Sequence, residues 1–105
     1  MLRIYGVCLE LVPVVVGLAR EIGTHDRDQA RQLRRSWMSV PLNVAEGSGG
    51  DGGTRRQRYK DALGSCRETI ANLECAAAAG YVEMEALDRD KLERVKATLI
   101  RILYM

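Results

Sequence analysis

The sequence lacks most of the residues on which enzymatic and metal chemistry depends. It contains no phenylalanine, two prolines and a single histidine, His25. Its three cysteines, Cys8, Cys66 and Cys75, form no CxxC pair and no metal-ligand spacing with that histidine. Scattered cysteines of this kind are typical of small core residues in a reducing cytosol, so we expect neither a disulfide nor a metal.

The sequence also has little net charge and no long apolar run. The formal net charge is only +2, so any attraction to nucleic acid must come from local patches. The longest uncharged stretch in the apolar first 22 residues covers residues 11–19, with Glu10 just before it. This stretch is too short to span a bilayer, and no signal-peptide cleavage pattern follows it. We therefore expect a cytoplasmic protein with no membrane partner.

Apolar periodicity predicts four helices, at about residues 2–22, 27–46, 55–79 and 85–104. Short connections between them predict an all-α, antiparallel up-down four-helix bundle formed by a single domain. A strand remains the alternative for the valine run at residues 14–16. The first helix is apolar over most of its circumference, which exceeds what one bundle covers. The excess predicts contact with another subunit.

Local signals predict where these helices begin and end. Asp26–Gln29 and Thr54–Gln57 have the pattern of capping boxes. The glycine-rich run at residues 47–53 is expected to end the second helix and form a flexible loop. Gly80 is expected to follow the third helix as its C′ residue. In the last helix the side chains expected to face inward are those of Leu92, Val95, Leu99 and Ile102.

Two blocks of sequence identify a family. Residues 39–47 read SVPLNVAEG, which contains Ser39, Pro41, Asn43, Glu46 and Gly47; residues 62–65 read ALGS, which contains Gly64 and Ser65. Glu68 and the Gly-Tyr-Val of residues 80–82 follow in order. The blocks resemble the signature of the four-helix-bundle family also called 23S ribosomal RNA intervening-sequence proteins. The chain departs from that signature at Arg58 and Ile70.

The resemblance implies a four-helix protomer of a ring-shaped homo-oligomer, commonly a homopentamer. A similar group, the accessory variability determinants of diversity-generating retroelements, implies a basic pentamer that works beside a reverse transcriptase. No cofactor is implied.

The motif residues also have a direct chemical interpretation. Asn43 and Glu46 are three residues apart and so share a helix face. Glu46 lies near a helix C-terminus, where its charge opposes the helix dipole, so we expect a cationic partner, with Arg56 the obvious candidate. We interpret the motif as a buried cap network that ties helices two and three together. Direct contact with a partner is the alternative.

A basic cluster follows the glycine run and carries the expected nucleic-acid or partner-binding residues. It comprises Arg55, Arg56, Arg58 and Lys60, and we expect Arg31, Arg34 and Arg35 of the second helix to lie close by. Arginines at a helix N-terminus favour phosphate. The alternative is an ordinary solvated face.

These features predict a non-enzymatic, homo-oligomeric binding scaffold that contacts RNA, DNA or a nucleoprotein such as a reverse transcriptase. A protein-binding adaptor is the alternative. A third hypothesis, a HEPN-type ribonuclease, rests on Arg20 and His25, but residues 23–24 break the helix between the two. The glycine run lacks the Gly-Lys-Ser/Thr ending of a phosphate-binding loop.

Overall fold

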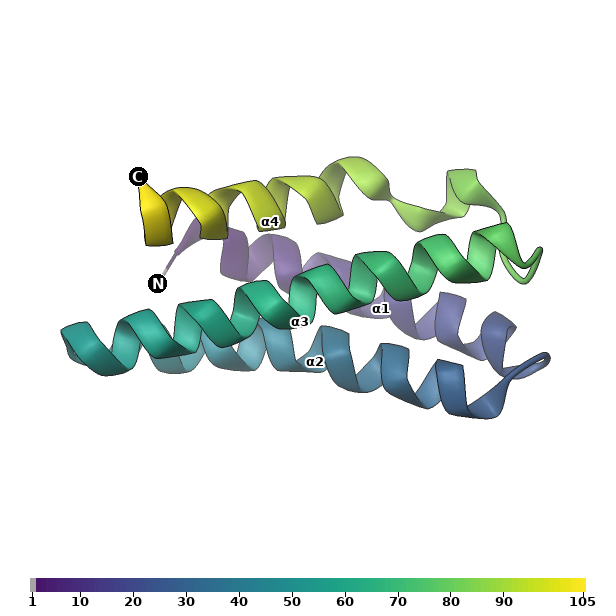
Figure 1. Ribbon diagram of the computed structural model, residues 1–105, viewed down its shortest axis with the longest axis horizontal. Coiled ribbons are helices and arrows are strands. Elements are labelled where there is room, and N and C mark those ends of the chain that lie inside the picture. Colours follow the sequence, from purple (N-terminus) through teal and green to yellow (C-terminus); the bar gives the residue numbers. More distant parts are fainter. Residues whose placement is uncertain (1) are drawn as a thin grey trace.

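Four α-helices run side by side in the computed structural model, which describes residues 2–105 (Figure 1). They are α1 (Arg3–Gly23), α2 (Arg27–Gly49), α3 (Gly52–Ala78) and α4 (Arg89–Tyr104), with a short 3₁₀ helix, η1 (Met84–Leu87), before α4. Successive helices are antiparallel, and the two termini lie at the same end of a bundle about 42 Å long. Residues 2–105 include no strand, so the all-α prediction is confirmed and the strand alternative is wrong.

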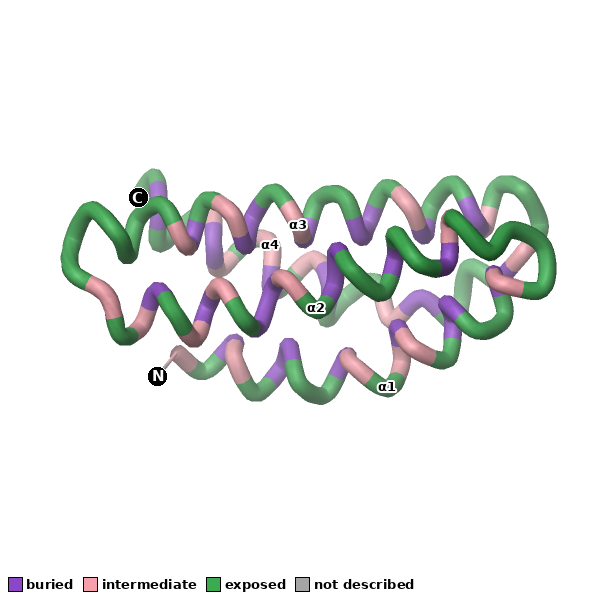
Figure 2. Tube along the Cα trace, turned by 90° about the horizontal axis from the view of Figure 1, so that it is seen from below, coloured by how far each residue is buried: buried purple, intermediate pink, exposed green. Residues whose placement is uncertain are grey.

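The core lies along the bundle axis, where each helix turns its apolar stripe inward (Figure 2). Trp37 is the largest fully buried side chain, and its indole N–H donates to the carbonyl of Cys8 at 3.2 Å. A buried indole needs such an acceptor. Both prolines lie inside helices. Pro13 is exposed, where water can reach the carbonyl that it leaves without a helical donor, whereas Pro41 is buried.

The glycine-rich run is more helical than its composition predicts. Helix α2 continues through Gly49 and α3 begins at Gly52, so only two residues connect them. The side chain of Asp51 accepts a hydrogen bond from the backbone N–H of Thr54 at 3.0 Å, which lowers the pKa of this carboxyl. Asp51 is therefore the N-cap of α3, and the prediction that Thr54 begins a capping box is wrong. Asp26 caps α2 as predicted, since it accepts from the N–H of Gln29 at 3.0 Å.

The end of α3 agrees with the sequence prediction, whereas the last inward-facing residue of α4 does not. Gly80 has a φ of 81°, and its N–H and that of Tyr81 donate to Ala77 and Ala76, which closes α3 as a Schellman motif. In α4 the last inward residue is Leu103, 6% exposed, whereas Ile102 is 39% exposed. The expectation for Ile102 is wrong because the inward row proceeds in steps of three, four and four residues from Leu92.

The cysteines separate into two environments. Cys8 and Cys66 are buried, and burial raises the pKa of each thiol to about 12. Cys75 is exposed, so the expectation that all three are core residues is wrong for it. It lies on the outer side of α3, next to the buried Ala76.

Candidate nucleic-acid interface

A row of polar contacts joins α2 to α3 along the length of the bundle. Ser36 and Thr69 share a hydrogen bond of 2.8 Å, and the Ser65 hydroxyl donates to Ser39 Oγ at 2.9 Å. Asn43 does not cross to α3. Its amide donates to the Ser39 carbonyl at 2.8 Å and to Ser39 Oγ at 2.9 Å. The motif residues Ser39, Asn43 and Ser65 therefore form one connected network between the two helices.

Glu46 pairs with a different arginine from the one predicted. Its carboxylate lies 3.0 Å from Nε of Arg58, and both side chains are roughly half exposed. An exposed ion pair of this kind contributes about 0–1 kcal/mol to the free energy of unfolding. Arg56 instead donates to the carbonyl of Leu103 at 2.7 Å, and its guanidinium lies 5.5 Å from the ring centroid of Tyr104. Arg56 thus ties the start of α3 to the end of α4.

The two motif glycines have opposite surroundings. Gly47 is buried, and a Cβ at this position would come within 2.6 Å of the Tyr59 ring. Only glycine lets this aromatic ring lie against α2. Gly64 is exposed, and a Cβ there would meet no atom within 4 Å. Gly64 is therefore not at a close contact between helices.

The predicted basic residues do not gather in one place. Gly49 lies 18 positions after Arg31 in α2, a distance of about 27 Å along the helix axis. Arg55, Arg56, Arg58 and Lys60 follow at that far end, where α3 begins. The expectation that Arg31, Arg34 and Arg35 lie beside them is wrong, because α2 is long enough to hold the two clusters at opposite ends of the bundle.

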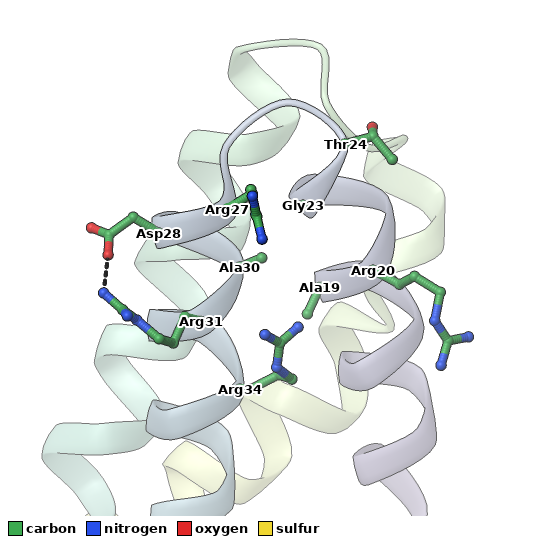
Figure 3. Close-up of a pocket in the computed structure, with 9 residues that line it drawn as sticks. All are labelled: Ala19, Arg20, Gly23, Thr24, Arg27, Asp28, Ala30, Arg31 and Arg34. Carbon is green, nitrogen blue, oxygen red and sulfur yellow. Dashed lines mark hydrogen bonds and ion pairs between the residues drawn. The ribbon is translucent and has the colours of Figure 1, made fainter.

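At the end where α1 turns into α2, a groove of about 670 Å³ is lined mainly by arginines (Figure 3). We call it the arginine groove. Its nine lining residues are Ala19, Arg20, Gly23, Thr24, Arg27, Asp28, Ala30, Arg31 and Arg34. The floor exists because small residues bring the helices close together: a Cβ on Gly23 would lie 3.5 Å from that of Ala30.

The four arginines of the groove are not equivalent. In Figure 3 the guanidinium groups of Arg27 and Arg34 lie between the two helices, whereas Arg20 points away from the gap. Arg31 turns outward to an ion pair with Asp28, the one acidic residue of the lining. Within residues 2–105, no carboxylate forms an ion pair with Arg27 or Arg34. Two like charges therefore face one hollow without compensation.

Of the groove arginines, Arg20 and Arg27 are absent from the nucleic-acid-binding residues predicted from the sequence, and Arg27 is the one of these two that faces the hollow. The signal is present in the sequence, because residues 27, 31 and 34 have the spacing of one helix face. Arg35, by contrast, lines a separate hollow of about 300 Å³ with Ser39, Ser65 and Glu68. The histidine of the ribonuclease hypothesis also lies elsewhere: His25 stacks on Tyr81 with ring centroids 4.6 Å apart and is not part of the lining that contains Arg20.

Residues 2–105 contain neither a metal site nor a membrane-spanning helix. This part of the chain holds no group of three or more His, Cys, Asp or Glu side chains that are arranged to bind a metal. None of its helices combines the length and the apolar character needed to cross a membrane.

The chain matches the sequence model of one protein family and shares its fold with a solved structure. The sequence matches none of the curated proteins. A crystal structure from Bacteroides thetaiotaomicron, described as a protein with unknown function from the S23 ribosomal protein family, has the same fold with a TM-score of 0.87. It is 20% identical, and the match covers 97% of this chain and 99% of that one. The family model of the 23S rRNA-intervening sequence proteins matches residues 1–103. The chain therefore belongs to the 23S rRNA-intervening sequence protein family.

Proposed function

We propose that the protein is a non-enzymatic binding scaffold that holds nucleic acid by its phosphate backbone in the arginine groove. One observation carries this proposal: Arg27 and Arg34 share a hollow, and no carboxylate of the described residues forms an ion pair with either of them. Guanidinium groups donate paired hydrogen bonds to phosphate oxygens, and a bound phosphate would relieve the repulsion between the two cations. With a net charge of +2, attraction to nucleic acid depends on such a local field.

Self-association is the second part of the proposal, with a pentamer as the subunit count that the sequence resemblance implies. Three large apolar side chains on α1 and α2 are exposed: Leu9 by 46%, Met38 by 38% and Leu42 by 63%. Contact with neighbouring subunits would remove this surface from water. An oligomer would also repeat the arginine groove around a ring, which raises the avidity for a strand that reaches more than one groove. Native mass spectrometry tests this part, and a folded monomer at micromolar concentration would contradict it.

The nucleic-acid part is tested by fluorescence anisotropy with single-stranded RNA, single-stranded DNA and duplex at several salt concentrations. We compare the wild type with an Arg27→Gln/Arg34→Gln variant. An Arg35→Gln/Arg67→Gln variant is the matched control, because it loses the same charge from exposed sites outside the groove. For single strands, the loss of two phosphate contacts should flatten the slope of log K against log salt by about 1.4.

Equal binding by both variants would contradict the assignment to the groove. If the wild type binds no nucleic acid at low salt, the scaffold holds a protein instead, which is the adaptor alternative. A partner such as a reverse transcriptase would then be sought through the exposed apolar residues of α1 and α2. Gel filtration of the wild type and both variants would show that the substitutions leave assembly unchanged.

A further inference from the structure

We propose that the arginine groove binds the end of a nucleic-acid strand, through its terminal phosphate, in preference to the interior of the strand. This inference rests on the proposed function and specifies the ligand of the same site. It comes from the shape of the groove and from the number of charges that face it.

The groove is closed at one end by the chain itself. Helix α1 ends at Gly23 and α2 begins at Arg27, so the connecting residues cross from one wall of the groove to the other. Figure 3 shows this connection arching over the hollow that Gly23 and Thr24 help to line. A strand that lies along the groove cannot continue past the connection without leaving the floor. The closed end therefore favours a strand that terminates there.

The charge of the groove fits a terminal phosphate better than an internal one. An internal phosphodiester carries one negative charge, whereas a phosphate monoester carries about 1.5–2 at neutral pH and has a third free oxygen. Arg27 and Arg34 supply two positive charges to the hollow, and the one lining carboxylate, Asp28, is paired with Arg31. Two guanidinium groups can each donate two hydrogen bonds, which together match the oxygens of a monoester.

Small residues line the part of the groove between Arg27 and Arg34 and the facing helix α1. Ala19 and Ala30 are fully or nearly fully buried, and neither side chain extends beyond a methyl group. No side chain longer than a methyl group therefore rises from this part of the lining, which leaves room for a phosphate beside Arg27 and Arg34.

The test uses oligonucleotides of one sequence that carry an internal fluorescent label and differ only at their ends. The four forms are 5′-phosphorylated, 3′-phosphorylated, hydroxyl-ended and circular. We expect one or both phosphorylated forms to bind at least about tenfold more tightly than the hydroxyl-ended and circular forms. This preference should disappear in Arg27→Gln/Arg34→Gln and persist in Arg35→Gln/Arg67→Gln. Arg34→Lys, which keeps the charge but loses the paired donors, should retain binding and lose most of the preference.

Each outcome separates this inference from the proposed function. Equal binding of all four forms overturns the terminal-phosphate assignment and leaves backbone binding intact. Absence of binding to every form overturns both. A nucleoside monophosphate that competes with the strand at comparable affinity would show that the site takes a free nucleotide, which also overturns the strand-end assignment. The comparison of the four forms on the wild type requires no variant, so it remains decisive even if a substitution prevents folding.

Discussion

Replacement of Gly47 by alanine should destabilise the bundle, although alanine is the better helix former. An added Cβ would lie 2.6 Å from Cε1 of Tyr59 and 2.9 Å from its Cδ1, well inside normal contact distance. Tyr59 is itself buried, and its hydroxyl lies 3.4 Å from the hydroxyl of Ser48, so the ring has little room to move. Either the ring changes rotamer or α3 moves away from α2.

Two opposing effects determine the size of this change. Overpacking of a core contact costs about 1–3 kcal/mol. Alanine in place of glycine recovers at most about 1 kcal/mol of helix propensity, and less near a helix end. The expected net loss is therefore about 0–2 kcal/mol, which corresponds to a drop in Tm of up to roughly 10 °C for a chain of this length.

Gly64→Ala is the matched control, because it makes the same chemical change in a helix interior with open space around the new methyl group. It should raise stability by about 0.5–1 kcal/mol. Thermal and urea unfolding followed by circular dichroism measure both variants. In a Tyr59→Leu background, Gly47→Ala should become neutral or stabilising, since the ring atoms are gone. If Gly47→Ala is as stabilising as Gly64→Ala in the wild-type background, the argument from the Tyr59 contact is refuted.

Three further predictions follow from individual contacts. Glu46→Ala should lower the free energy of unfolding by less than about 1 kcal/mol in a urea titration, because its ion pair is exposed to solvent; a larger loss would show that the pair is shielded in an oligomer. Arg56→Ala should cost about 1–2 kcal/mol, since it leaves the last turn of α4 without its guanidinium donor, and amide hydrogen exchange should accelerate there before it does elsewhere. In the native protein at pH 8 a thiol reagent should modify Cys75 alone, because Cys8 and Cys66 are buried and their pKa values are raised to about 12; mass spectrometry of the labelled chain would contradict this if all three react together.

The apolar periodicity was sufficient to predict the helices but not their ends. A run with five glycines in seven residues has low helix propensity. It is nevertheless mostly helical here, because Asp51 caps α3 and the long flanking helices pack against each other. Tertiary packing of this kind cannot be inferred from local composition. The capping aspartate was itself part of the run that was expected to be a loop.

Contacts between helices were harder to predict than the helices themselves. Arg56 and Arg58 are two residues apart, which places them about 200° apart around α3. The choice between them as the partner of Glu46 therefore depends on the rotation and register of α3 against α2. No local signal in the sequence fixes that register.

The partners of each arginine separate a structural cluster from a binding one. At the α2–α3 end, Arg56 bonds to the carbonyl of Leu103 and Arg58 to Glu46, so these side chains stabilise the bundle. At the α1–α2 end, Arg27 and Arg34 face a hollow and form no ion pair within residues 2–105. Charge reversal at Arg56 would therefore loosen the end of α4, so a loss of binding in that variant would not by itself locate the interface. Arg27 and Arg34 are exposed and form no ion pair in the described residues, so we expect their substitution to leave the fold intact. A change in affinity in that variant would then report on the ligand itself.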